Sequence, residues 1–317
     1  MIALWGPADD PVLEPVHREL LARGLPVLAV DPRRAPADFA FHAGGAEAGP
    51  AVDGHIAGVP LRRISAAYLR PHGTADVLQA QGWTADSPQA RDLAAFAEGF
   101  LAWTETTDVL VVNRLSAQAS NTSKPGQAEA IRTCGFPVPP TLVTTDPAAA
   151  RHFLDRHPQA VAKSVSGVRS IVRRLDAHDL ERLEDVRHCP TQFQAYVPGT
   201  DYRVHVVGDR VLAVLVHSEA DDYRYDIRTE RIPVTLPEEL ADRCRALAHS
   251  LRLPLAGIDL RRTPDGRWVC FEVNPSPGFT YFEDDGGGIT RAVADLLAAR
   301  TAARTAARTR TAAGAGA

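Results

Sequence analysis

The sequence predicts an α/β protein whose first lobe contains a parallel β-sheet. Residues 2–5 are apolar, residues 11–23 have a helical pattern, and residues 26–31 are apolar again, which is the order of a strand–helix–strand unit. A fully apolar run at 108–113 reads as a further buried strand. Strands alternating with helices are typical of a parallel sheet, so we expect one here.

The remaining elements of the first lobe follow in order. Residues 66–71 have the composition of a strand, and residues 87–106 form a long helical pattern. Ser87 followed by Pro88 suits an N-cap and a first helical position. The lobe is therefore expected to close near residue 113.

The second half of the chain is expected to be rich in antiparallel hairpins. Residues 160–175 alternate strand-forming residues around a Ser/Gly loop, which predicts a hairpin with a mobile tip. Residues 201–208 and 210–218 should pair around Gly208 and Asp209. After a predicted helix at 237–251, residues 255–262 and 267–274 form two strands around a Pro-Asp-Gly turn.

Composition excludes several classes of protein. The net charge is −4, with 35 basic and 39 acidic residues interspersed, so we expect no nucleic-acid partner and no membrane patch. No run reaches the ~20 apolar residues of a membrane span, and the first ten residues carry no basic segment, so we expect a cytoplasmic protein. The four cysteines lack a CxxC pair and favour neither zinc nor disulfides.

Only two of the 35 basic residues are lysines, Lys124 and Lys163, and the other 33 are arginines. A lysine that persists in such a sequence indicates a place where a compact ammonium group is needed, such as a narrow phosphate site. Lys163 precedes a run of small residues, 164–170, whose backbone N–H groups can approach anionic oxygens. Chance persistence and an ordinary hairpin turn are the alternatives.

The C-terminal hairpin carries three oxygen donors. Residues two apart in a strand face the same side, so Glu272 and Asn274 converge, and the hairpin brings Asp259 alongside. Hard oxygen ligands in this number suit Mg²⁺ that takes its other ligands from water and phosphates. The alternative is a solvated sheet face, but both carboxylates stand in otherwise apolar strands.

These motifs together resemble the ATP-grasp ligases. Lys124, Lys163 with its small-residue loop, the segment 191–216, AGIDL and FEVNPSPGF occur in the order and spacing of that superfamily. The resemblance is closest to the branch of the ribosomal-protein glutamate ligases and the peptide-macrocyclising graspetide ligases. It covers about residues 113–297, whereas the first lobe matches only in its α/β character.

The resemblance implies an ATP-grasp fold with an N-terminal parallel α/β domain. The domains expected from it are 1–113 (the pre-ATP-grasp domain), 114–198 (phosphate loop and hinge) and 199–300 (metal site). The low-complexity composition of 301–317 separately predicts a disordered tail.

The resemblance also implies the site residues. ATP would be held by two lysines, a loop, a hinge and a ribose contact: Lys124, Lys163, Ser166, Gly167, Gln194, Ala195, Tyr196, Val197 and Asp201. Asp259, Glu272 and Asn274 would hold two Mg²⁺ ions. Arg224, in an Asp-Tyr-Arg element, would clamp the γ-phosphate or the substrate carboxylate, with Arg203 and Arg261 as weaker candidates. Ala195 stands where family hinges often carry an acidic residue.

The expected activity is amide formation between a carboxylate and an amine through an acyl phosphate. The substrate is expected to be a peptide, a protein side chain or an amino-acid-like molecule, and a homo-oligomer stays open. A kinase on the same scaffold would use the same phosphate and metal residues. A non-catalytic nucleotide-binding protein is disfavoured because both lysines and all three metal ligands are retained.

Overall fold

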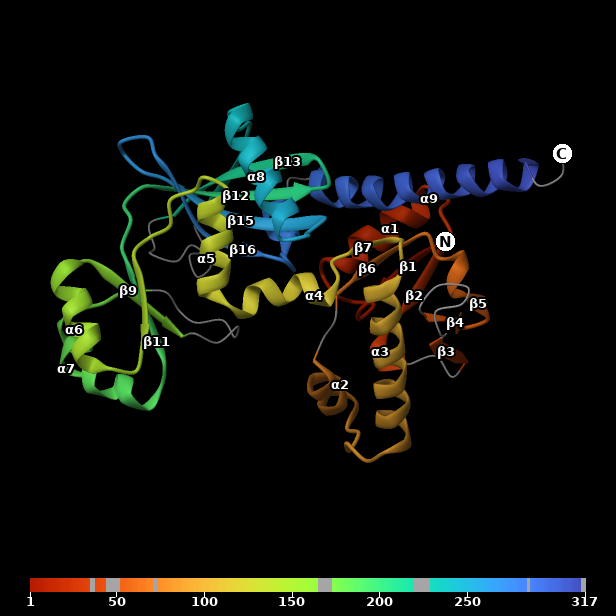
Figure 1. Cartoon of the computed structure of the whole chain (residues 1–317), viewed down its shortest axis with the longest axis horizontal. Coiled ribbons are helices and arrows are strands. Elements are labelled where there is room, and N and C mark those ends of the chain that lie inside the picture. Colours follow the sequence, from red (N-terminus) through yellow and green to blue (C-terminus); the bar gives the residue numbers. More distant parts are fainter. Residues whose placement is uncertain are drawn as a thin grey trace. The chain divides into compact units, whose positions relative to one another are not determined.

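The computed structural model describes residues 1–34, 38–43, 52–70, 73–164, 173–218, 229–283 and 286–314. They form two compact units. Unit 1 contains 1–118, 253–255 and 276–317, and unit 2 contains 119–252 and 256–275. Figure 1 shows the helices and strands of both.

Unit 1 is built on the predicted parallel sheet. Its elements are β1 (Ile2–Trp5), α1 (Leu13–Ala22), β2 (Val27–Val30), η1 (Pro32–Arg34), β3 (Phe39–Ala43), β4 (Val52–Ile56), β5 (Val59–Pro60), η2 (Leu61–Arg63), β6 (Ala66–Leu69), α2 (Thr74–Gln81), α3 (Pro88–Thr106), β7 (Leu110–Val112), α4 (Leu115–Gln118), η6 (Phe279–Phe282) and α9 (Gly288–Gly314). The main sheet has the order β2-β1-β6-β7 with every pair parallel, and β3-β4-β5 form a separate antiparallel sheet.

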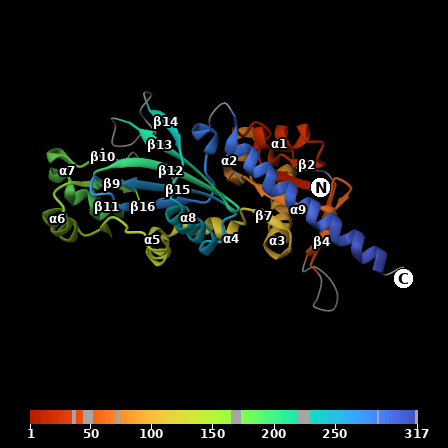
Figure 2. The ribbon, with the colours of Figure 1, turned by 90° about the horizontal axis from the view of Figure 1, so that it is seen from above.

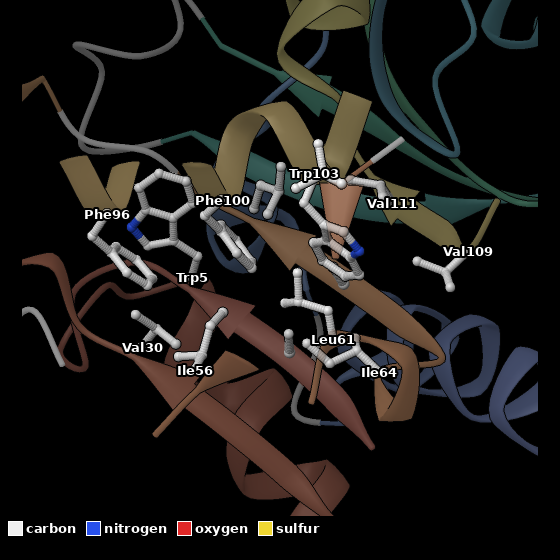
Figure 3. Close-up of a cluster of buried hydrophobic side chains, with 14 residues drawn as sticks. Trp5, Val30, Ile56, Leu61, Ile64, Phe96, Phe100, Trp103, Val109 and Val111 are labelled. Carbon is white, nitrogen blue, oxygen red and sulfur yellow. The ribbon is translucent and has the colours of Figure 1, made fainter. Parts of the chain in front are cut away.

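The core of unit 1 lies between α3 and the parallel sheet. Phe96, Phe100 and Trp103 come from one face of α3, and Figure 3 shows them beside Trp5 of β1. The rings of Trp5 and Phe100 meet edge to face with centroids 4.9 Å apart. Ser87 caps this helix, as predicted, by accepting from the Ala90 N–H.

The C-terminal segment belongs to unit 1, which corrects the prediction that 276–300 join the metal-site domain. Helix α9 packs against α1 and β6, and Figure 2 shows it as one long helix running past α1. It continues to Gly314, where the sequence predicted a disordered tail from 301. Alanine and arginine are strong helix formers, so this low-complexity composition extends a helix that tertiary contacts have already started.

Unit 2 contains two antiparallel-rich sheets. Its elements are η3 (Ala119–Thr122), α5 (Lys124–Thr133), β8 (Thr141–Thr144), α6 (Pro147–Arg156), β9 (Ala160–Ser164), β10 (Arg173–Arg174), α7 (Ala177–Glu181), η4 (Leu183–His188), β11 (Thr191–Ala195), β12 (Thr200–Val207), β13 (Arg210–His217), β14 (Glu230–Val234), α8 (Glu238–Ser250), β15 (Leu255–Arg262) and β16 (Trp268–Asn274). The sheets have the orders β10-β9-β11-β8 and β14-β13-β12-β15-β16.

The predicted hairpins of unit 2 are present. Strands β9 and β10, β12 and β13, and β15 and β16 each pair antiparallel, while the tip between β9 and β10 lies outside the described residues. Helices α6 and α7 lie on one side of β9 and β11 (Figure 1), where Phe153 and Phe193 are buried together.

All four cysteines are free thiols. Among the described residues, no helix is long and apolar enough to cross a membrane.

Candidate functional site

The hairpin β15–β16 brings the predicted metal ligands together. Asp259 and Glu272 are direct cross-strand partners, and Asn274 lies two residues beyond Glu272, opposite Gly257. The register shifts between Asp259 and Leu260, so that Phe271 is an extra residue on β16. A bulge of this kind bends the strand and re-aims side chains next to a site.

Each of the two carboxylates has a cationic partner. The Lys124 ammonium donates to Glu272 Oε2 at 3.0 Å and to Asn121 Oδ1 at 3.0 Å. The Arg203 guanidinium donates to Asp259 Oδ1 at 2.6 Å. Arg203 is buried, whereas Asp259 is partly buried, with 25% of its side chain exposed. The structure thus brings Lys124 of α5 and Arg203 of β12 to the same hairpin.

These surroundings shift the pKa values of the two carboxyl groups in opposite directions. Burial raises the pKa of Asp259 above its usual range, against the opposing effect of Arg203. Burial alone would also raise the pKa of Glu272, but Lys124 and Lys163 outweigh it and hold that pKa below its usual range. A nearby cation stabilises the ionised form of a desolvated carboxylate such as Asp259 more than that of a carboxylate in water.

Gln127 fixes the strand that carries two of these ligands, and the sequence analysis did not identify it. Its side-chain amide donates to the Val273 carbonyl at 2.8 Å and accepts from the Val273 N–H at 2.9 Å. Val273 stands between Glu272 and Asn274 on β16, which is an edge strand. A glutamine in the first turns of α5 therefore satisfies the main chain of the metal-site strand.

A cavity of 320 Å³ lies beside the hairpin. Part of its lining comes from residues that sit opposite one another on β8, β9 and β11, since Gln192 pairs with both Lys163 and Val143, and Gln194 pairs with Thr141. The other lining residues come from α5, the segment after it and β16: Lys124, Pro125, Gln127, Ala128, Arg132, Val138, Pro139 and Phe271. Both lysines of the chain therefore line one cavity, and Phe271 reaches it from the bulge.

The predicted hinge is held by Arg261. The guanidinium binds both oxygens of Asp201, at 2.6 and 2.7 Å, and donates to the Val197 carbonyl at 2.7 Å. It also lies 5.8 Å from the centre of the Tyr196 ring. Gly199 has a φ of +148° and approaches the Arg262 carbonyl too closely for any Cβ. The hinge thus has contacts that fix its path beside β15.

Three predicted residues cannot be placed. Ser166, Gly167 and Arg224 lie outside the described residues. Of the other hinge residues, Ala195 is a buried small side chain, and Gln194 donates to Thr141 Oγ1 at 3.1 Å. Sequence reasoning missed Phe271 and Gln192, although both belong to motifs that it quoted.

The donor set fits magnesium better than a softer metal. Among the described residues, no group of three or more His, Cys, Asp and Glu side chains is arranged to hold a metal ion by itself. The hairpin instead offers two carboxylates and one amide, a partial oxygen shell that suits an ion completed by water and phosphate oxygens. The residues present therefore fit Mg²⁺ bound together with a phosphate ligand.

Unit 1 contains a larger cavity, of 510 Å³, beside β1, β2 and α1. Two of its lining charges are paired with each other, because Arg33 binds Asp31 at 2.7 Å. We assign the chemistry to the smaller cavity because it contains both lysines and adjoins the two partly buried carboxylates.

The model of the RimK-like ATP-grasp domain matches residues 133–297, about half of the chain. The chain belongs to the RimK-like ATP-grasp family. The family assignment confirms the predicted ATP-grasp fold and the predicted branch. The match ends within α9 and leaves the first lobe outside it.

Curated relatives of the family match over part of their length. A D-alanine–D-alanine ligase of Cereibacter sphaeroides is 29% identical over 182 residues, which are 52% of this chain and 59% of that protein. A probable alpha-L-glutamate ligase of Xylella fastidiosa is 34% identical over 99 residues, or 30% of this chain and 33% of the relative. The chain thus spans little more than half the length of the D-alanine–D-alanine ligase, which is the longer of these two matches.

Solved structures match almost the whole chain. The ATP-grasp ligase PsnB, complexed with minimal precursor, Mg and ADP, is 31% identical with a TM-score of 0.74 over 95% of this chain and 97% of that one. A RiPP-associated ATP-grasp ligase of Chryseobacterium gregarium, complexed with ADP and a leader and core peptide, has a TM-score of 0.76. It is 21% identical over 94% of this chain and 97% of that one, which shows a shared fold.

Proposed function

We propose that the chain is an ATP-dependent carboxylate–amine ligase that forms an amide bond and releases ADP and phosphate. One observation carries the proposal: the Asp259–Glu272 pair adjoins a cavity that contains both lysines of the chain. Membership of the RimK-like ATP-grasp family and the likeness to PsnB, solved with Mg, ADP and a precursor, support it.

The proposed roles follow from charge and position. Lys124 and Lys163 neutralise the phosphates of ATP, and the hinge from Gln194 to Val197 binds adenine, with Asp201 near the ribose. Asp259, Glu272 and Asn274 hold two Mg²⁺ ions, which when bound neutralise charge on the transferring phosphoryl group. The ion pair of Lys124 with Glu272 keeps that carboxylate ionised and ready for a metal.

The contacts of Arg203 and Arg261 support roles for them that differ from those expected from the sequence. Arg203 lies against Asp259 and can orient a substrate carboxylate or a phosphate beside the metal ligands. Its Nε also lies 3.4 Å from Nε2 of buried His205, whose pKa burial lowers well below the ordinary value, so the imidazole is neutral and can accept. Arg261 is committed to Asp201 and Val197, and Arg224 keeps its proposed role as a clamp.

The proposed substrates are a carboxylate and an amine on a peptide, a protein side chain or an amino acid. The peptide class is favoured because PsnB was solved with a precursor peptide. In the proposed reaction, a carboxylate oxygen attacks the γ-phosphorus and ADP leaves; the amine nitrogen then attacks the acyl carbon and phosphate leaves. The cytoplasmic location and a homo-oligomer stay predictions.

The proposal is tested by measuring ADP and phosphate release over pooled amino acids and short acidic peptides, with mass spectrometry of the acceptors. Glu272→Gln is the matched inactive control, because it keeps the shape and removes the charge. We expect acceptor-dependent release and a product lighter by one water than its combined precursors. A phosphorylated acceptor would instead establish a kinase, and absence of Mg²⁺-ATP binding would refute both activities.

A further inference from the structure

Gln192 is a buried polar side chain in the wall of the 320 Å³ cavity. It is 3% exposed, and its Oε1 accepts no hydrogen bond from any residue that the structure describes. It stands on β11, directly opposite Lys163 on β9 and Val143 on β8. Buried amide oxygens are normally paired, so this acceptor calls for a donor from a ligand.

The surroundings of Gln192 suit a flat heteroaromatic ring. Phe271, Val138 and Pro139 supply apolar walls to the same cavity. Its volume is at the lower end of the roughly 300–1,000 Å³ typical of small-molecule sites. Gln194, the next residue on the same face of β11, already uses its amide nitrogen on Thr141 Oγ1. The amide oxygen of Gln192 therefore remains for a ligand.

A glutamine amide matches one edge of adenine. Its oxygen can accept from the exocyclic amine while its nitrogen donates to the adjacent ring nitrogen. Guanine carries a carbonyl oxygen in place of that amine, which would face the Gln192 oxygen with like charge. Because Lys163 stands opposite Gln192, a base read by Gln192 would lie one strand away from a group proposed to bind the phosphates.

We propose that Gln192 is a specificity-determining residue that reads the amino edge of the nucleobase and selects adenine over guanine nucleotides. This inference rests on the proposed function, since it takes the cavity as the nucleotide site. It adds to the hinge contacts a side-chain contact from the strand before the hinge.

The test measures calorimetric binding of ADP and of purine riboside diphosphate, which lacks the exocyclic amine, in the presence of Mg²⁺. The wild-type protein should bind ADP roughly tenfold more tightly, as expected for one well-made hydrogen bond in a buried site. Gln192→Met should lose about this factor for ADP and little for the analogue, so that the two affinities converge. Val143→Met, which changes the same cavity without removing an amide, should shift both ligands alike and keep their ratio.

Equal binding of ADP and purine riboside diphosphate by the wild-type protein would overturn the role of Gln192 while leaving the nucleotide site intact. This comparison needs no variant. Retention of the tenfold preference in Gln192→Met would overturn it as well. If the wild-type protein binds neither diphosphate, the proposed function fails, and the inference fails with it. GDP provides a further check, since Gln192→Met should narrow the gap between ADP and GDP.

Discussion

The amide clamp of Gln127 on Val273 predicts how firmly the metal-site strand is held. Gln127→Met keeps the length of the side chain but leaves both the N–H and the carbonyl of Val273 without their partner. Gln127 is 3% exposed, so water cannot easily replace it. An unpaired buried polar group costs about 1–2 kcal/mol here, which gives about 2–4 kcal/mol for the two groups together.

This loss of stabilisation is best measured at Val273 itself, because a chain of two compact units need not unfold in one step. Native-state hydrogen exchange at the Val273 amide should accelerate roughly 30- to 1,000-fold, the equivalent of about 2–4 kcal/mol. The Mg²⁺ concentration needed for half-maximal nucleotide binding should rise, because Glu272 and Asn274 flank the released residue.

The matched control is Glu129→Met on the same helix, since the Glu129 side chain is 74% exposed and makes a surface ion pair with Arg132. It should leave both readouts unchanged. The clamp does not position the metal ligands if the Val273 amide exchanges as slowly in Gln127→Met as in Glu129→Met and both variants bind Mg²⁺-nucleotide equally well.

Three further predictions concern the hinge, acid stability and the core. Arg261→Met should weaken ADP binding about tenfold in calorimetry by freeing the hinge, whereas the exposed neighbour Arg262→Met should not; equal effects would contradict this. Burial opposes ionisation of Asp10, but the hydrogen bonds and charge of Arg70, together with two backbone N–H groups, lower its pKa below 3.8 in the folded state. Its stabilisation is therefore present above pH 3.8 and lost as the pH falls through the folded pKa, so Asp10→Asn should flatten the acid end of a stability–pH profile. Phe96→Ala should destabilise unit 1 by about 3–5 kcal/mol in denaturant titration, and a loss under 1 kcal/mol, within ordinary surface-mutation scatter, would contradict the assigned core.

Local patterns predicted much of the fold because the forces behind them act locally. The apolar run at β1, the Ser87 cap and the alternation of Glu272 with Asn274 each depend on neighbours within a few residues. The alternation of strands with helices predicted the parallel first sheet, and the short turn of the hairpin predicted the pairing of Asp259 with Glu272; both are confirmed.

Long-range contacts could not be predicted in the same way. The bond of Gln127 to Val273 joins residues 146 positions apart, and nothing in the sequence of α5 indicates it. The bulge at Phe271 depends on the register of β15 and β16, so simple alternation assigns this side chain to the wrong face. The return of α9 to unit 1 was missed because the apolar stripe of Ile289, Val293 and Leu297 predicts a buried helix face but not the unit against which that face packs.

The central claim is that a carboxylate is activated by phosphorylation and then captured by an amine. It is tested most directly with an acidic peptide acceptor whose carboxylates carry a heavy oxygen isotope, followed by mass analysis of the released phosphate. The account predicts one heavy oxygen in each phosphate, since that oxygen bridges carbon and phosphorus in the intermediate and leaves with phosphorus. Amide product accompanied by unlabelled phosphate would contradict it.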